Sequence, residues 1–179
     1  MLKVMYEVYQ DWDKVFEYLV FSLDDLIDIM KRAKERRIKV IGWDDAGVHG
    51  HKYLYFRDKD KVELLSAWID VVRTRIAGWL ITTPDPRNLV RPVRESPGFY
   101  YGKVVLRGSG LLRLLKAYER IYLPSGEIMI RKSYYDTFKC RLPDDVYKQY
   151  MELRMRFYEE AERQLMKYIQ KKEQELELT

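Results

Sequence analysis

The sequence has 179 residues, of which 47% are hydrophobic and 34% are charged, and its formal net charge is +5. This length suits one compact domain, or one domain with a helical appendage, and is enough to bury a core. No stretch approaches the ~20 apolar residues of a membrane span, and early acidic residues interrupt any signal-peptide pattern. We therefore expect a cytoplasmic protein without a membrane partner.

The first part of the chain alternates between helical and strand patterns. Apolar residues at spacings of three and four predict a helix over residues 3–19 that bends or ends near Asp11. Ser22 is expected to cap the next helix, with Asp25 at the capping-box position. After the first helix, the expected elements are a short strand at 18–21, a helix over 23–36, a strand over 38–43 and a loop over 46–60. A helix over 61–76 ended by Gly78, a strand over 79–83 and a short basic helix over 85–95 that Pro92 would cut are expected to follow.

The pattern changes after Pro97. A strand is expected over residues 99–107, and residues 111–123 and 126–140 are expected to pair as a hairpin around the turn sequence Pro-Ser-Gly. A last helix is predicted from about residue 144 to the C-terminus. Helices alternating with short apolar strands predict an α/β core with a parallel sheet over residues 1–97. A β-hairpin and a long C-terminal helix would then fill residues 98–179.

The charge is unevenly spread along the chain. Residues 1–83 hold 14 basic and 14 acidic side chains, residues 84–156 hold 15 and 8, and residues 157–179 hold 4 and 6. The basic middle suits an anionic partner such as nucleic acid, or it is a solvated surface. Aromatic residues between its lysines and arginines suit single-strand binding, although packed sheets also contain many aromatics. The candidate nucleic-acid-binding residues are Arg87, Arg91, Arg94, Arg107, Arg131 and Lys132.

The stretch with the clearest chemical meaning is Ile38–Asp45, with the sequence IKVIGWDD. It predicts a buried strand whose carboxyl end carries Asp44 and Asp45, and ligands of open α/β sheets bind at that edge. Asp44 suits Mg²⁺ binding through a water molecule, and Asp45 suits the polarisation of an attacking water. The next expected strand ends in Thr82 and Thr83.

Residues 38–94 resemble the core of P-loop ATPases of the additional-strand class, in particular DNA-handling ATPases of archaeal plasmids and viruses. In that class a Walker B strand ends in carboxylates, and the following strand ends in a polar residue that senses the γ-phosphate. The resemblance implies Mg²⁺ and ATP as ligands, Asp44 as the metal- and cofactor-binding residue, and Asp45 and Thr82, or Thr83, as catalytic residues. It implies a partial P-loop-NTPase-like sheet with flanking helices.

One part of that family pattern is missing. No GxxxxGKS or GxxxxGKT sequence occurs, although such a loop cradles the phosphates with its backbone N–H groups and lysine. The glycine-rich stretch at residues 107–110 lacks the lysine and lies downstream of Asp44. Asp45 also replaces the usual glutamate. We therefore expect an incomplete or degenerate ATPase that binds ATP poorly alone and acts as a homo-oligomer or with a P-loop-bearing partner.

Other functions stay open. His49 and His51 near the two aspartates could bind Zn²⁺ or Mn²⁺, or form a two-metal nuclease site with a further ligand. Arg87, Arg91 and Arg94 would share a helical face and could reach a neighbouring subunit's phosphate, or form salt bridges. The chief alternative to an ATPase is a non-enzymatic nucleic-acid-binding or assembly protein whose long helix mediates oligomerisation.

Overall fold

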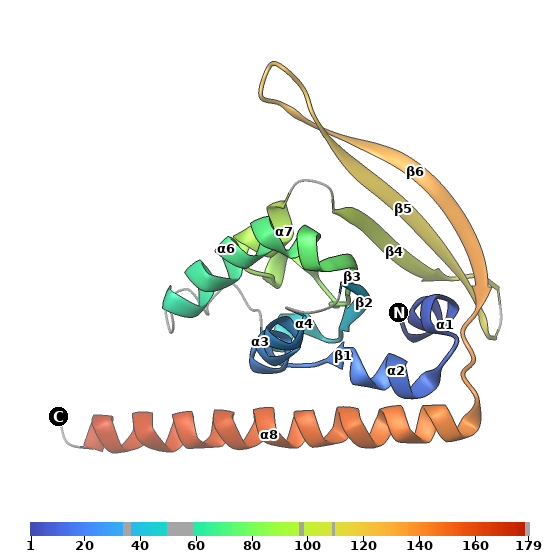
Figure 1. Ribbon diagram of the computed structural model, residues 1–179. Coiled ribbons are helices and arrows are strands. Elements are labelled where there is room, and N and C mark those ends of the chain that lie inside the picture. Colours follow the sequence, from blue (N-terminus) through green and yellow to red (C-terminus); the bar gives the residue numbers. More distant parts are fainter. Residues whose placement is uncertain (34–36, 50–58, 97–98, 109, 178–179) are drawn as a thin grey trace. The chain divides into compact units, whose positions relative to one another are not determined.

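The computed structural model describes residues 1–33, 37–49, 59–96, 99–108 and 110–177. They form two compact units, one of residues 1–90 and 143–179 and one of residues 91–142. The elements, drawn in Figure 1, are α1 (Leu2–Tyr9), α2 (Trp12–Glu17), β1 (Leu19–Val20), α3 (Leu23–Arg32), β2 (Ile38–Trp43), α4 (Ala46–His49), α6 (Lys59–Arg75), β3 (Ile76–Ile81), the 3₁₀ helix η1 (Pro86–Asn88), α7 (Arg91–Glu95), β4 (Tyr100–Leu106), β5 (Leu112–Tyr122), β6 (Ile128–Lys139) and α8 (Asp144–Glu177).

The first unit is built on a parallel sheet of three strands in the order β1-β2-β3. β2 lies in the middle, and its last residue, Trp43, is level with Val20 of β1 and Ile81 of β3. Every β2 residue except Lys39 is buried, as expected for an apolar run in a parallel sheet that is covered on both faces. The α/β class and the parallel sheet predicted from the sequence are confirmed.

Helix α1 packs on β2, and it contacts this strand through Met5 and Tyr9. A Cβ atom at Gly42 would lie 2.5 Å from the Met5 sulfur, so glycine allows the helix to approach the strand. At the end of α1, the Tyr9 hydroxyl donates to the Val40 carbonyl at 2.7 Å and accepts from the Val40 N–H at 3.1 Å. These contacts fix the centre of the sheet against its N-terminal helix.

Trp43 anchors the core beside the sheet's carboxyl edge. It is fully buried, and its indole stacks on Trp79 of β3 with ring centroids 6.0 Å apart. Its Nε1–H donates to the Phe21 carbonyl at 3.1 Å, so the polar atom of this large side chain is satisfied. The largest fully buried side chains are Trp43, Met5, Ile41, Leu65, Val15 and Val20.

Helix α3 begins with the capping box predicted from the sequence. The Ser22 hydroxyl accepts from the Asp25 N–H at 3.1 Å, and the Asp25 carboxylate accepts from the Ser22 N–H at 3.2 Å. These bonds satisfy N–H groups that a helix start otherwise leaves without partners.

We expect Ser22→Ala to lower the free energy of unfolding by about 1 kcal/mol, because alanine offers no acceptor to the Asp25 N–H. Urea unfolding followed by circular dichroism measures the change. Ser125→Ala is the control, since that serine lies exposed in the β5–β6 turn, and its stability should equal that of the wild type. Equal stability of Ser22→Ala would contradict the role of the cap.

Some local predictions are wrong. Ala46–His49 form helix α4, whereas we expected a loop; the rest of that loop, residues 50–58, lies outside the described residues. Gly78 does not end a helix, because α6 ends at Arg75 and continues directly into β3. Gly78 lies instead within β3, where it pairs with Val40 of β2.

The single basic helix over residues 85–95 is also wrong, because two short helices stand there. The Asp85 carboxylate accepts from the Arg87 N–H at 2.9 Å and so caps η1, and the backbone after η1 is extended. Helix α7 then begins anew at Arg91. Pro92 lies in its first turn, where a helix needs no N–H donor, so it starts the helix and does not cut it.

The second unit is a three-stranded antiparallel sheet in the order β4-β5-β6. β5 and β6 form the predicted hairpin, and β4 pairs along the other edge of β5. Gly126 in the turn has φ +85°, a conformation that suits glycine. A register shift at Ala117 and Tyr118 places these residues opposite Tyr134 and Lys132, so the β6 strand has one extra residue there.

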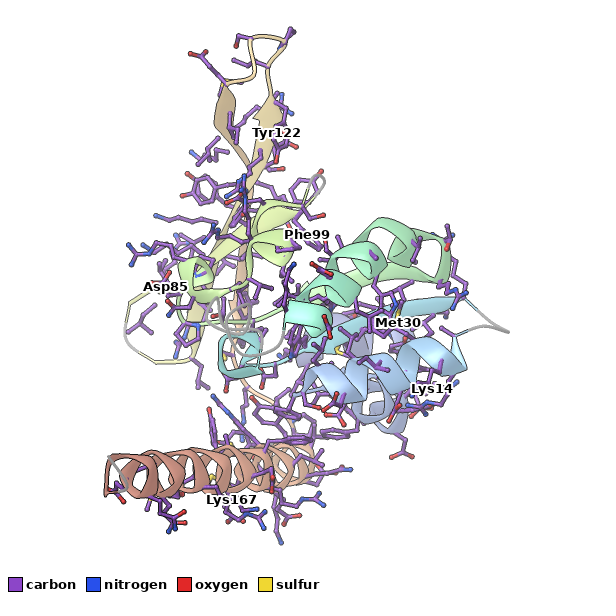
Figure 2. The ribbon with its side chains drawn as sticks, turned by 90° about the vertical axis from the view of Figure 1, so that its left-hand side faces the viewer. Lys14, Met30, Asp85, Phe99, Tyr122 and Lys167 are labelled. Carbon is purple, nitrogen blue, oxygen red and sulfur yellow. The ribbon has the colours of Figure 1, made fainter. Side chains whose placement is uncertain are left out.

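Helix α8 spans 34 residues and runs along one side of the first unit (Figures 1 and 2). The long C-terminal helix predicted from the sequence is confirmed. Its grouping differs from the expected division after residue 97, because α8 belongs with the parallel sheet and not with the hairpin. Among the described residues, no helix is both long and apolar enough to cross a membrane.

Candidate functional site: the carboxyl edge of β2 and β3

Two carboxylates and a hydroxyl meet where the neighbouring strands β2 and β3 end. Trp43 and Ile81 are level in the parallel register, so the residues after them, Asp44 and Thr82, emerge side by side. The Thr82 hydroxyl donates to the Asp44 carboxylate and accepts from the Asp45 N–H at 3.1 Å. The structure therefore brings these three residues together, whereas their catalytic roles stay a prediction.

The two threonines at the end of β3 differ in position. Thr82 reaches the carboxylates, whereas the Thr83 hydroxyl donates to the Asp85 carbonyl at 3.2 Å. A Cβ atom at Gly47 would lie 2.8 Å from that same hydroxyl oxygen, so α4 packs closely on Thr83. Of the two candidates for the sensing position, the structure brings only Thr82 to the carboxylates.

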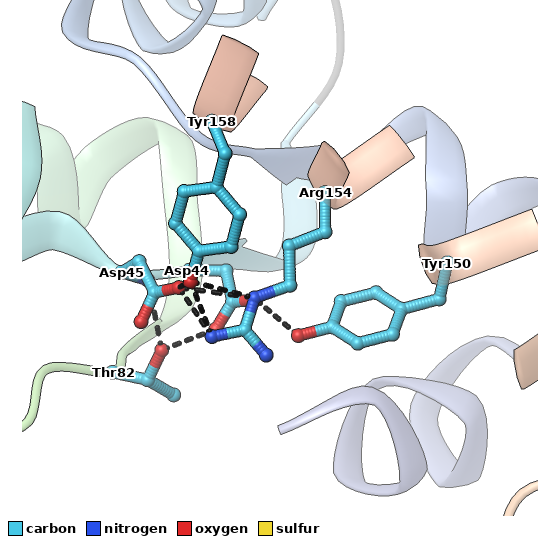
Figure 3. A network of polar contacts seen from close by, with 6 residues as sticks. All are labelled: Asp44, Asp45, Thr82, Tyr150, Arg154 and Tyr158. Atoms are coloured by element: carbon cyan, nitrogen blue, oxygen red, sulfur yellow. Dashed lines mark hydrogen bonds and ion pairs between the residues drawn. The ribbon is translucent and has the colours of Figure 1, made fainter. Parts of the chain in front are cut away.

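Helix α8 supplies further polar groups to this edge, as Figure 3 shows. Tyr150 donates to the Asp44 carboxylate at 2.5 Å. Arg154 donates to the Asp45 carboxylate through Nη2 at 2.6 Å and Nε at 3.1 Å, and Tyr158 donates to the same oxygen at 2.6 Å. Residues four apart share a helix face, so one face of α8 covers both carboxylates.

The edge is shielded from water to different degrees. Asp44 is 6% exposed and is the one charged residue among the described residues that is buried. The side chains of Asp45 and Arg154 are 18% and 31% exposed. A buried carboxylate is costly unless hydrogen bonds compensate it, and Asp44 receives them from Thr82 and Tyr150.

The two tyrosines and the arginine of α8 are held in their ordinary protonated forms. Burial raises the pKa of Tyr150, and its hydrogen bond to the Asp44 carboxylate raises that pKa further. The same two causes, with Asp45 as the acceptor, raise the pKa of Tyr158. Burial lowers the pKa of Arg154, but the hydrogen bond to Asp45 and the neighbouring charge outweigh it, so that pKa is also raised. At neutral pH, α8 therefore offers two hydroxyl donors and a cation to the edge.

Apolar contacts hold α8 beside these polar groups. The Phe21 ring, just after β1, stacks on Phe157 at 4.6 Å and on Tyr150 at 6.5 Å between centroids. Val146, one turn before Tyr150, is 4% exposed. The helix is therefore seated by aromatic packing as well as by its bonds to the carboxylates.

Sequence reasoning missed the contribution of α8. The sequence pattern predicted the long helix but assigned no role to Tyr150 or Arg154. Their partners Asp44 and Asp45 lie more than a hundred positions away in the chain. The spacing of four between Tyr150, Arg154 and Tyr158 was the one local signal, and it shows a common helix face without showing what that face covers.

Comparison with known proteins places the chain in a family. No protein-family model matches the sequence, and no solved structure matches it. Over 176 residues it is 31% identical to an uncharacterized protein, B-251, of Sulfolobus spindle-shape virus 1, a match that covers 89% of this chain and 68% of the viral protein. The chain belongs to the B-251 family. That relative comes from a virus, in line with the expected link to a mobile genetic element, and its name states no activity.

The candidate nucleic-acid-binding residues of this B-251 family member fall into two groups. Four form ion pairs: Arg87 with Asp85, Arg91 and Arg94 with Glu95, and Arg131 with Glu119. The other two contact uncharged side chains of the β4–β6 sheet, Arg107 with Thr137 and Lys132 with Tyr135. The shared helical face expected for Arg87, Arg91 and Arg94 is wrong, because Arg87 lies in η1 and the other two lie in α7.

The structure shows no ligand cluster for the alternative metal sites in the residues that it describes. Within the described residues, no group of three or more His, Cys, Asp or Glu side chains could hold a metal ion. The His49 side chain and all of His51 lie outside the described part of the chain. The metal site at these histidines and the nuclease site built on them therefore stay predictions.

Proposed function

We propose that the first unit is an ATPase-derived domain of a mobile genetic element, and that Asp44, Asp45 and Thr82 form the remnant of its Mg²⁺–nucleotide site. The supporting observation is the hydrogen bond from Thr82 to Asp44, which joins the carboxyl ends of two neighbouring parallel strands. Ligands of open α/β sheets bind at such ends. The domain would act in the cytoplasm, where nucleotide and nucleic acid are both present.

The oxygen donors at this edge suit Mg²⁺. Proteins usually hold Mg²⁺ with one or two carboxylates and leave its remaining positions to waters and phosphate oxygens. Asp44 supplies a carboxylate, and Thr82 supplies a hydroxyl within hydrogen-bond reach of it. Arg154 opposes the binding of Mg²⁺, because its guanidinium lies 2.6 Å from the Asp45 carboxylate and already supplies a positive charge there. Both Asp44 oxygens also accept hydrogen bonds, from Thr82 and Tyr150. The donor set would therefore fit the ion once Arg154 releases Asp45 and Tyr150 releases Asp44.

Each residue has a role in this proposal. Mg²⁺, when bound, would neutralise the charge on the nucleotide phosphates. Asp44 would hold the ion through a water, Asp45 would orient an attacking water, and Thr82 would donate to the γ-phosphate or that water. The 179 residues contain no phosphate-binding loop. The phosphates would therefore be cradled by a partner that carries such a loop, and the chain alone should bind nucleotide weakly.

Calorimetric titration with Mg-ATP tests the proposed site. We expect weak binding by the wild type, and its loss in Asp44→Asn, which keeps the size of the side chain but removes its charge. Asp28→Asn is the control, because Asp28 is an exposed α3 residue paired with Lys31, and it should bind as the wild type does. Absence of binding at millimolar nucleotide would contradict the site in this chain, and equal binding by Asp44→Asn would place the nucleotide elsewhere.

A second candidate function is nucleic-acid binding by the second unit, without catalysis. Residues 91–142 contain 11 basic and 4 acidic side chains, and a basic module of this kind suits a phosphate backbone. The two candidates are compatible, because they use different units of the chain.

A further inference from the structure

The two faces of the β4–β5–β6 sheet carry different charges. Side chains alternate between the faces of a sheet, and residues directly opposite each other share a face. Applied to the register of the three strands, this rule separates their charged residues. The lysine face holds Lys103, Arg107, Lys116, Arg120, Lys132 and Lys139 and no carboxylate from the strands; the opposite face holds Arg113, Glu119, Arg131 and Asp136. Figure 2 shows side chains standing off both sides of the hairpin.

Side-chain contacts agree with this division. On the lysine face, Arg107 donates to the Thr137 hydroxyl at 3.1 Å, and the Lys132 ammonium lies 4.2 Å from the centre of the Tyr135 ring. On the opposite face, Arg131 forms its ion pair with Glu119. The register shift after Ala117 is what puts Lys132 and Tyr135 on one face.

The lysine face holds like charges next to each other. Lys103 of β4 stands directly opposite Lys116 of β5, an arrangement that destabilises a sheet. Within the described residues, no carboxylate forms an ion pair with Lys103, Lys116 or Lys132, and Glu95 of α7 already pairs with arginines at 2.7 Å. A bound polyanion would relieve this repulsion.

Tyrosine rings lie among these lysines. Tyr118 is the neighbour of Lys132 across the strands, and Tyr135 is the neighbour of Lys116. Tyr135 is 51% exposed; because the Lys132 ammonium lies over one side of its ring, a base would stack on the other side or displace that ammonium. Tyr101 stands opposite Tyr118, and Arg120 lies 4.5 Å from the centre of the Tyr101 ring. Both the Tyr101 hydroxyl and the Arg120 guanidinium donate to the Arg94 carbonyl of α7, so α7 covers that end of the face. The exposed part of the face carries Lys103, Lys132 and Tyr135.

We propose that the lysine face of the β4–β5–β6 sheet binds single-stranded nucleic acid, with Lys103, Lys116 and Lys132 contacting phosphates and Tyr118 and Tyr135 stacking on bases. The proposal rests on the second candidate function and adds the surface, the residues and the strandedness. Single strands expose bases, and these bases stack on aromatic rings whatever their sequence. A duplex or an anionic membrane would use the lysines alone and leave the tyrosines without a role.

The adjacent residues Tyr134 and Tyr135 give a matched test. They are 52% and 51% exposed and lie on opposite faces. The probe is a fluorescent oligothymidine longer than the ~4–16 nucleotides that a single binding module covers, and its anisotropy is titrated with the full chain. We expect Tyr135→Ala to weaken binding at least fivefold, and Tyr134→Ala to leave it within twofold, with unchanged circular dichroism for both. Equal effects of the two variants would overturn the proposal.

Neutralised charges give the second test. We expect Lys116→Gln with Lys132→Gln to weaken binding about tenfold and to reduce the slope of log K against log salt by about 1.4, because each phosphate contact on a single strand contributes about 0.7. The single variants Arg113→Gln and Lys116→Gln remove the same charge from opposite faces of the sheet. Arg113 donates only to the backbone carbonyls of Gly110 and Leu112, so its variant should change binding less than twofold, whereas Lys116→Gln should weaken it more than twofold. Equal weakening by these two single variants would overturn the face assignment but leave nucleic-acid binding standing.

Three further probes separate the possible partners. An oligouridine of the same length distinguishes RNA from DNA, and tighter binding of either single strand than of duplex DNA supports the proposal. Duplex binding that equals single-strand binding would overturn the strandedness. Binding to phosphatidylserine vesicles with none to either oligonucleotide would overturn both the proposal and the second candidate function.

Discussion

Replacing Arg154 with alanine is expected to raise the affinity of the β2–β3 edge for Mn²⁺, used as a probe for Mg²⁺, at least tenfold. The guanidinium lies 2.6 Å from the Asp45 carboxylate and neutralises the negative charge that a divalent ion would need. Two unit charges 4 Å apart interact by about 4 kcal/mol at an effective dielectric constant of 20. Arg154 is 31% exposed, and solvent therefore weakens its interaction with a bound ion. We take about a third of the ~4 kcal/mol, and an energy of about 1.4 kcal/mol corresponds to a tenfold change in Mn²⁺ affinity.

Electron paramagnetic resonance measures free Mn²⁺ in such a titration. The matched control is Arg156→Ala, because Arg156 is an exposed arginine of the same helix that donates only a long bond, 3.4 Å, to a backbone carbonyl of α8. Arg156→Ala removes the same charge two positions from Arg154 and should change the Mn²⁺ affinity less than twofold. An unchanged affinity in Arg154→Ala would mean that Asp45 anchors α8 and does not take part in a cation site.

Tyr150→Phe is expected to lower the free energy of unfolding at neutral pH by about 1–3 kcal/mol, because it removes a hydrogen bond to a buried carboxylate. Phenylalanine keeps the ring that stacks on Phe21, so the change isolates the hydroxyl. Urea unfolding measures the effect. Tyr147→Phe, at an α8 residue that is 53% exposed, is the control and should match the wild type.

The stability difference between wild type and Tyr150→Phe should depend on pH. Burial and the bond to Asp44 raise the pKa of Tyr150 above the ordinary value of 10.0. A raised pKa in the folded state means that the hydroxyl stabilises the fold fully below pH 10 and less as pH rises further, because the unfolded chain then ionises first. The difference should therefore narrow above pH 10. A difference that stays constant into the alkaline range would contradict this bond.

The sequence was most informative where local pattern and structure have the same cause. Strand β2 is an apolar run bounded by charged residues, and a buried parallel strand requires that pattern. The cap at Ser22 needs only residues three apart, so it could be located to the residue. The place of Asp44 and Asp45 at the carboxyl end of β2 followed from the same pattern, because the buried strand ends where its apolar run ends.

The parts that could not be predicted depend on distant or ambiguous neighbours. Gly78 fits a helix stop as well as a strand, and only its pairing with Val40 of β2 separates the two. Tyr150 has an apolar ring and a polar hydroxyl, so its place on a helix stripe does not show that it bonds a carboxylate. Likewise, alternation along β6 predicts two faces, but the register shift that joins Lys132 and Tyr135 on one of them depends on pairing with β5.

The return of α8 to the parallel sheet makes the second unit an insertion, held to the first unit by the chain at both of its ends. The hydrogen bonds and the ion pair of Tyr150 and Arg154 thus close a long loop of the chain that contains the whole antiparallel sheet. Loop closure by a flexible chain costs only about 0.6 kcal/mol more for each doubling of its length, so this architecture tolerates changes in the size of the insert. Release of α8 from the strand edge would open the loop and leave the sheet on a single tether.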